Sequence, residues 1–399
     1  MKNGVSFGAD IADPQTGAGD VDLVDAIADV EAAVVQRLYL GGARHAPERP
    51  RNAFGDSVSL EQHAPGGFAA QVHQATAAIS RGERVGLLAS ARELLTVREA
   101  LAAIAARRLA TVFHALEPVG GDAAHALAEL GWALLYAADV AESVDLTLVA
   151  RRAAEDSGTP VLGVQDPPRA GRHQVAVPLE RPQIAGFVGP ADARMRAESD
   201  PSHPSHAEVD PRALADRVPF ALASALRDLE SLTGRKRDVL TRNGLGQGAD
   251  APLVFLAVGS LGEFLLDEVA RLRADGHDVG AVKLTAFRPF PGPRAVRLLG
   301  RAHAITVIEH TDLPLAQSNA VTRELKAAFA DALTWAPDYP GIGRIPRIHS
   351  AVMSSRRVDA RDVDAILRNM LAGEQGKRFL SLTGGATPEG ESPASRAHL

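Results

Sequence analysis

The sequence predicts an α/β protein built from two doubly wound domains, and three observations lead to this prediction. Short apolar runs alternate with helical patterns in both halves of the chain, as a parallel sheet covered by helices requires. A long stretch rich in proline and polar residues separates the two halves. The chain has 399 residues, of which 46% are hydrophobic, so it is long enough to form two packed domains.

The first half contains a helical pattern from Asp22 to about Leu40, where apolar residues recur three and four positions apart. Further helices are predicted from the same periodicity at about 67–80, 98–108 and 140–158. Short apolar runs predict strands at 85–90, 110–116, 131–137 and 159–166. This order of strands and helices favours a parallel sheet with helices on both faces.

The second half repeats the pattern in four strand–helix units over about 120 residues. Strands are predicted at 251–260, 278–287, 304–310 and 344–352, and helices at 262–274, 316–331 and 361–372, with a short helix ending at Leu299. The proline-rich RPFPGP segment forms a stiff turn into that short helix. The second half is therefore predicted to be a doubly wound domain as well.

The changes in composition also suggest domain boundaries. We expect a first domain at 21–175, an irregular connection at 176–250 with one helix at about 214–232, and a second domain at 251–383. The Gly-, Asp- and Ser-rich ends, 1–20 and 384–399, are predicted to be disordered tails.

Charge and composition exclude several classes of protein. The formal net charge of −6 argues against a nucleic-acid binder that relies on a basic surface. No run of about 18 apolar residues predicts a membrane span, and the N-terminal segment lacks the apolar stretch of a secretory signal, so we expect a cytoplasmic protein. Cysteine is absent, which excludes disulfides and iron–sulfur clusters held by thiolates of this chain.

Local motifs have structural explanations. The glycines of NGLGQG (243–248) precede a strand, whereas a phosphate loop follows one, so we interpret them as a linker. VGS (258–260) lies at a strand's carboxyl end, where ligands bind in open α/β sheets, but a tight turn explains it equally well.

Histidines and acidic residues raise the possibility of a metal or catalytic site. His203 and His206 lie in a polar Pro/Ser loop and are interpreted as solvated. Glu309, His310 and Asp312 cluster at a strand's carboxyl end and are interpreted as a structural or interface cluster. No metal site is predicted.

Longer patterns resemble the 2-oxoacid:ferredoxin oxidoreductases, such as pyruvate:ferredoxin oxidoreductase. The segment GWALLYAADVAESVDLTLVARRAAEDSGTPVLGVQDPPRAGRH (131–173) is similar to part of their first domain. DLESLTGRKRD (228–238) resembles the segment that leads into their second domain, and VGSLGEFLLDEVARLRADGHDVGAVKLTAFRPFPGPRAVRLL (258–299) resembles the start of that domain. The resemblance covers about 20–335 in the same order.

The resemblance implies an alpha-type subunit with a pyrimidine-side thiamine diphosphate (ThDP) domain and a transketolase-C-like domain. It implies oxidative decarboxylation of a small 2-oxoacid, with electrons passed to iron–sulfur clusters. The implied partners are a beta-type subunit that binds ThDP and Mg²⁺, a gamma-type subunit, and an iron–sulfur ferredoxin-like subunit or domain. ThDP would be shared with the beta-type subunit, while Mg²⁺ and the clusters would lie on partner chains.

The implied site residues depart from the family pattern. A glutamate beside the pyrimidine is expected in the segment SLEQHAPGGFAAQVHQA (59–75), where Glu61 and His63 are the catalytic candidates. The substrate-binding candidates are Arg49 and Arg92, which occupy expected Thr and Gly positions, and Glu117. The position of an expected arginine falls on Glu117 or on the adjacent Pro118.

Two further residues, Asp166 and Arg169, match the family's "DGFR…H" loop and are the cofactor-binding candidates. The segments expected to contact the pyrimidine and the substrate therefore differ from the family pattern, whereas the longer segments that form the surrounding domains keep it. This pattern leaves two hypotheses open: a working subunit with an unusual substrate, or a catalytically silent structural paralogue that organises a complex.

Overall fold

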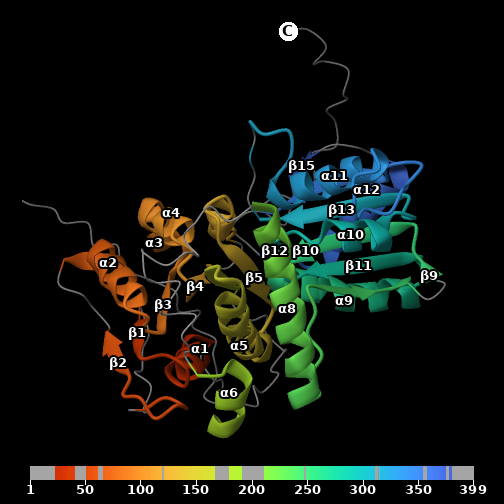
Figure 1. The fold of residues 1–399 in the computed structure, drawn as a ribbon. Helices are drawn as coiled ribbons and strands as arrows, with labels where there is room; N and C mark the ends of the chain where they lie inside the picture. The colour runs from red at the N-terminus through yellow and green to blue at the C-terminus, as the bar shows by residue number, and fades with distance from the viewer. Residues whose placement is uncertain are drawn as a thin grey trace, which may run out of the picture.

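The computed structural model describes residues 23–40, 51–61, 66–118, 121–166, 179–190, 211–246, 249–310, 313, 315–353, 357–373 and 377–379. These residues form two sheets, each flanked by helices, which lie side by side (Figure 1). The α/β architecture with two domains agrees with the prediction from the sequence. The predicted tails 1–20 and 384–399 lie outside the described residues.

The first sheet has seven strands in the order β12-β5-β6-β4-β3-β1-β2, and its neighbouring strands are parallel except for β12 with β5. Its elements, in chain order, are α1 (Leu23–Ala32), β1 (Arg37–Leu40), β2 (Ser59–Glu61), α2 (Gly67–Ser80), β3 (Val85–Ser90), α3 (Ala91–Thr96), α4 (Arg98–Ala106), β4 (Val112–Leu116), the 3-10 helix η1 (Ala123–Leu127), β5 (Ala133–Ala137), α5 (Val140–Ser157) and β6 (Val161–Gln165). Buried apolar side chains of α2, α3 and α4 pack on one face of the sheet, and those of α1 and α5 pack on the other.

In the described part of the connection between the sheets, the structure has the helices α6 (Arg181–Val188) and α8 (Pro211–Thr233). The prediction of a single helix in this connection was wrong, because proline was read as a sign of irregular structure, whereas Pro182 lies in the first turn of α6, where proline is tolerated. Helix α8 runs along α5, and the apolar side chains of both helices share one core cluster (Figure 1).

The second sheet has six strands in the order β15-β14-β13-β10-β11-β7, all parallel except the edge strand β7. Its elements, together with a small hairpin and the strand β12, are β7 (Leu240–Asn243), β8 (Leu245–Gly246), β9 (Ala249–Asp250), β10 (Leu253–Val258), α9 (Gly259–Ala274), β11 (Val279–Leu284), β12 (Ala286–Arg288), α10 (Gly292–Leu299), β13 (Ala304–Glu309), α11 (Ala320–Leu333), β14 (Arg347–Val352), α12 (Ala360–Ala372) and β15 (Lys377–Phe379). Helices α9 and α12 cover one face of this sheet, and α10 and α11 cover the other.

Two predicted elements were wrong in extent. The helical pattern at 22–40 ends as a helix at Ala32, and Arg37–Leu40 forms a strand between β2 and β3. Three of these four strand residues are buried, and a short apolar run of this kind has no periodicity that separates strand from helix. The predicted strand 278–287 divides at Thr285 into β11 and β12, which belong to different sheets.

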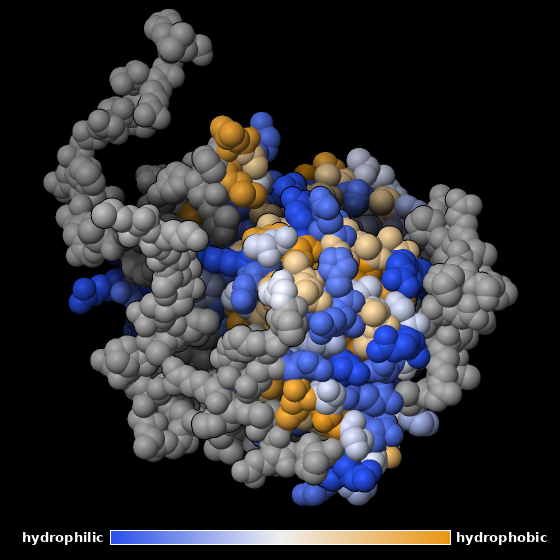
Figure 2. Space-filling model, turned by 90° about the vertical axis from the view of Figure 1, so that its left-hand side faces the viewer, coloured by the Kyte–Doolittle hydropathy of each residue, from blue (hydrophilic) through white to orange (hydrophobic). Residues whose placement is uncertain are grey.

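Strand β12 joins the two domains. It pairs antiparallel with β5 of the first sheet, and the Tyr136 N–H donates to the carbonyl of Thr285 at 2.7 Å. One core cluster continues from the α2–α4 side of the first sheet to the α10–α11 side of the second. The face of the first domain in Figure 2 carries small, separate hydrophobic patches among hydrophilic residues where it is described.

Candidate functional site between the two sheets

Polar side chains from both sheets meet where several parallel strands end. Glu117 follows β4, Asp166 follows β6, and Ser260 lies in the first turn of α9 directly after β10. Glu309 ends β13 and His310 follows it. The carboxyl ends of parallel strands are where open α/β sheets place ligands, so this cluster is the candidate functional site of the described chain.

Glu117 is a buried carboxyl group of the cluster whose pKa is raised into the neutral range. The residue is only 4% exposed, and its Oε1 accepts the Ala124 N–H at 2.5 Å while Oε2 has no partner among the described residues. Burial, together with the nearby charges of Asp122 and Asp166, raises the pKa of Glu117 to about 7 even though the backbone donors oppose this. Glu117 can therefore hold or release a proton near neutral pH.

Asp122 links the two domains by accepting the His310 N–H at 2.6 Å. Its carboxylate also lies 3.6 Å from Nδ1 of His125. Burial alone would raise the pKa of Asp122, but His125 and His310 lower it overall, so the group is an anion. Burial opposes protonation of His125, but the Asp122 charge outweighs it and raises the pKa of His125.

Asp166 makes a second link between the domains. Its Oδ2 accepts hydrogen bonds from the backbone N–H and the hydroxyl of Ser260, at 3.0 and 3.1 Å. Burial and the charge of Asp122 raise the pKa of Asp166 in spite of these donors. The preceding Gly259 has φ 54°, and a Cβ there would lie 2.5 Å from Asp166 Oδ2, so this close approach requires glycine.

Glu309 holds the start of α11. Its Oε1 accepts the Val321 N–H and its Oε2 accepts the Thr322 hydroxyl, both at 2.7 Å. Burial raises the pKa of Glu309 overall, although these donors and the nearby His125 act to lower it. The His310 Nδ1 donates to the Met353 carbonyl at 2.7 Å, which fixes the ring at the end of β14.

Tyr136 completes the cluster from β5. Its ring packs 5.4 Å from His125, and Phe287 of β12 meets His125 edge-on at 4.9 Å. Burial raises the pKa of Tyr136 well above its usual value, so the hydroxyl stays protonated. Tyr136 Oη, His125 Nε2 and Glu117 Oε2 are all buried without partners among the described residues, and buried polar atoms ordinarily have one.

The arrangement can therefore hold protons on several of its buried groups. It combines four carboxyl groups with two histidines, so it disfavours an added anion. Within the described ranges, no group of three or more His, Asp or Glu side chains is placed to hold a metal ion. No described helix is long and apolar enough to cross a membrane.

Sequence comparisons place the chain among known proteins. The family of pyruvate:ferredoxin oxidoreductase core domain II matches residues 251–345. Pyruvate-flavodoxin oxidoreductase of Klebsiella pneumoniae is 28% identical over 311 residues, which are 71% of this chain and 26% of that protein. Pyruvate synthase subunit PorA of Pyrococcus horikoshii is 27% identical over 218 residues, which are 51% of this chain and 54% of that protein.

Solved structures agree on the fold. The 2-oxoglutarate:ferredoxin oxidoreductase from Magnetococcus marinus matches 88% of this chain and 64% of that chain with a TM-score of 0.57 and 13% identity. The chain is thus similar to 2-oxoacid:ferredoxin oxidoreductases in part of its sequence and in its fold. It spans about a quarter of the length of the Klebsiella relative and about half of the PorA relative. A split-gene transketolase structure also shares the fold, at TM-score 0.51 and 14% identity.

The structure brings together two of the site residues suggested by the family resemblance. Glu117 and Asp166 follow the paired strands β4 and β6, whose last residues are in register. Glu61 ends β2, three strands from β4 in the sheet order, which corresponds to about 14 Å at the usual strand spacing. Arg92 lies in the first turn of α3, directly after β3, and is exposed. Arg49, His63 and Arg169 lie outside the described residues.

The described candidates do not together fit ThDP. Glu61 Oε1 already accepts from Arg37 at 3.1 Å and from the Ser59 hydroxyl at 3.3 Å. Glu117 and Asp166 bind the neighbouring loop and the second domain instead. No reaction step through ThDP is therefore assigned to the described residues of this oxidoreductase-like chain.

Ser260 belongs to the VGS segment (258–260), for which the sequence left a ligand site and a tight turn open. Three residues of the cluster were not considered from the sequence: Asp122, His125 and Tyr136. Their only signals were their places near strand ends and the Asp-Ala-Ala-His spacing of 122–125. The structure places Glu309 and His310 at the contact between the domains, in agreement with their interpretation as an interface cluster, while Asp312 lies outside the described residues.

Proposed function

We propose that the chain is an alpha-type subunit of a ThDP-dependent 2-oxoacid:acceptor oxidoreductase complex. The observation that carries the proposal is that one fold match spans 88% of the chain, while sequence similarity to pyruvate oxidoreductases spans 71%. In this proposal the first domain covers 21–175, the connection 176–250, and the transketolase-C-like domain 251–383. The complex would decarboxylate a small 2-oxoacid and pass electrons to iron–sulfur clusters.

The proposed complex includes three kinds of partner subunit, which would supply the iron–sulfur clusters, the Mg²⁺ and most of the ThDP contacts. Its sequence has no cysteine, so thiolate-held clusters belong to an iron–sulfur subunit or domain. A beta-type subunit would hold Mg²⁺ and most of the ThDP contacts, because the described residues here do not assemble a ThDP site. A gamma-type subunit completes the proposed assembly.

A second candidate function is a catalytically silent subunit that organises such a complex. The observation that favours it is Glu117, which stands where the family resemblance places an arginine for the substrate carboxylate. Glu117 is buried beside Asp122 and Asp166, and this surplus of carboxyl groups would repel a 2-oxoacid anion.

The deciding experiment is purification of the native complex through a tag on this chain, with assays of bound ThDP, iron and 2-oxoacid-dependent reduction of an artificial acceptor. Turnover by the complex that changes in Glu117→Gln, which alters the candidate site, but not in the exposed control Glu99→Gln, supports the first function. A complex whose turnover is unaffected by Glu117→Gln, or that has none, supports the silent subunit. Turnover by the isolated chain would overturn both.

A further inference from the structure

Helix α11 ends in an unusual way, with a tryptophan where glycine is the common residue. The Ala336 N–H donates to the Asp331 carbonyl at 2.9 Å, and the Trp335 N–H donates to the Ala332 carbonyl at 3.3 Å. These two bonds define a Schellman motif, whose residue after the C-cap adopts the left-handed conformation. Trp335 occupies that position with φ 59°.

The conformation holds the indole in a fixed place on the surface. An L-residue with a side chain is strained in the left-handed region by roughly 1–2 kcal/mol, and a bulky residue there is rare. Trp335 is nevertheless 76% exposed, and its ring lies against Gly341, where a Cβ would come within 2.3–2.8 Å of ring atoms. Trp335 therefore combines a strained backbone at a helix end with an aromatic ring that is mostly exposed to solvent.

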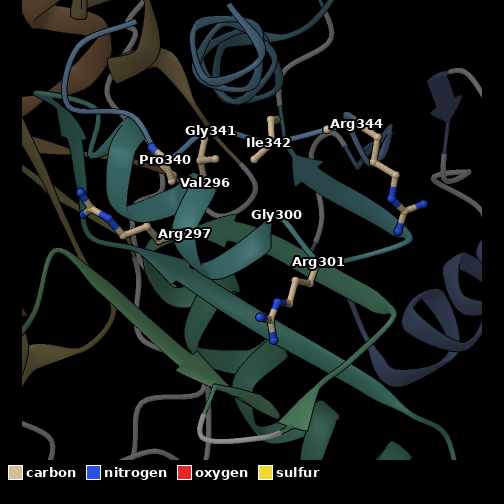
Figure 3. A pocket seen from close by; sticks show the side chains of 9 residues that line it. Val296, Arg297, Gly300, Arg301, Pro340, Gly341, Ile342 and Arg344 are labelled. Carbon is tan, nitrogen blue, oxygen red and sulfur yellow. The ribbon is translucent and has the colours of Figure 1, made fainter. Parts of the chain in front are cut away.

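Three arginines surround the pocket beside this ring. The pocket has a volume of about 510 Å³ and includes Arg297, Arg301, Arg344 and Gly341 among its lining residues, none of which is acidic. Arg344 makes no ion pair within the described ranges, and Arg297 makes a 3.4 Å contact to the Asp338 carbonyl. Figure 3 shows the three guanidinium groups on different sides of the pocket, not converging on one point.

We infer that Trp335 and the arginines around this pocket form a docking surface for an acidic segment of a partner protein. Tryptophan and arginine are the residues most enriched among those that dominate binding energy at interfaces. Arginines that point apart match carboxylates spread over a protein surface better than one compact phosphate. A second copy of this chain is disfavoured, because a two-fold contact would place these arginines against each other.

The inference rests on the proposed function in one respect: the partner is expected to be a subunit of the same complex. Its acidic character and its contact with the indole are the additional claims. They can fail while the complex and its activity remain intact.

The first test places a photo-crosslinking benzoylphenylalanine at position 335 of the tagged full-length chain and isolates the native complex. A matched control carries the same group in place of Phe220 of α8, which is 72% exposed. We expect position 335, but not position 220, to crosslink to a partner peptide in which Asp and Glu outnumber Lys and Arg. A crosslink to a non-acidic peptide, to a second copy of this chain, or to no protein would overturn the inference.

The second test uses variants that do not disturb folding. Trp335→Gly removes the ring at a position that favours glycine, and Arg344→Glu reverses an exposed charge without an ion-pair partner within the described ranges. Each should reduce the amount of the partner identified in the first test that co-purifies, without crosslinking, with the tagged chain in 0.15 M salt. The expected reduction is about 30-fold, the loss typical of a dominant interface residue. Arg361→Glu on α12 is the charge control. Retention equal to wild type in both variants, with intact circular dichroism, would refute the docking surface.

Discussion

Glu117 makes the stability of the protein depend on pH in a direction opposite to that of an ordinary ion-paired carboxylate. Its pKa is about 7 in the folded chain and near 4.5 when exposed. The folded state therefore binds the proton more tightly than the unfolded state, so the free energy of unfolding falls as pH rises through this window. The difference of 2.5 in pKa corresponds to about 3 kcal/mol, lost progressively between about pH 4.5 and pH 7 and absent above it.

The perturbation that tests this is Glu117→Gln. Glutamine keeps an oxygen for the Ala124 N–H and carries no charge beside Asp122 and Asp166. The variant should therefore exceed wild type in stability by less than about 1 kcal/mol at pH 5 and by up to about 3 kcal/mol at pH 8. Urea unfolding at pH 5, 6, 7 and 8 measures this, with fluorescence of the buried Trp132 as the probe of the first domain.

Two controls isolate the effect. Glu99→Gln on α4 removes an exposed charge and should leave the pH profile of wild type unchanged. A Trp335→Gly background leaves Trp132 as the sole tryptophan, since the chain has two. If Glu117→Gln retained the wild-type fall in stability between pH 5 and pH 8, the assignment of a proton to Glu117 would be refuted.

Three further predictions concern folding. Lys283→Met removes the buried ammonium group that lies 2.9 and 2.8 Å from two glutamates, and should lower the free energy of unfolding by about 3–5 kcal/mol in urea titrations; an unchanged midpoint would contradict the buried pair. Gly244→Ala places a Cβ 2.6 Å from a carbonyl oxygen of β11 at φ 69°, and should lower stability by about 1–3 kcal/mol, seen as a lower Tm, whereas an equal Tm would argue against the close approach. Trp335→Gly should raise stability by about 1 kcal/mol, and a lower Tm would show that the left-handed helix end is not strained.

Much of the fold could be predicted because its strands are short apolar runs between helices. The helix at 67–80 and the strand at 85–90 have the predicted bounds. Strand β1 could not be predicted, because VVQRLYL is apolar without a distinguishing period. The division at Thr285 could not be predicted either, since the pattern of DVGAVKLTAF (278–287) does not indicate that its two ends join different sheets.

The candidate site could be predicted only in part. Glu117 and Asp166 were candidates through the family resemblance, and they lie close together because they follow adjacent strands of one sheet. The contact between Asp122 and His310 joins residues 188 positions apart and depends on how the two domains pack. Such a contact arises from tertiary packing, which local sequence patterns do not predict.

Strand β12 ties the two domains together, so a cut between them would expose an unpaired strand edge. A fragment ending before residue 251 would leave the backbone donors and acceptors of β5 uncovered on one side, and such a bare strand margin invites aggregation. A fragment that begins at residue 251 would contain β12 without β5, the strand with which β12 pairs. The two halves are therefore expected to be inherited and expressed as one block, and any gene split or fusion that preserves solubility should occur outside it.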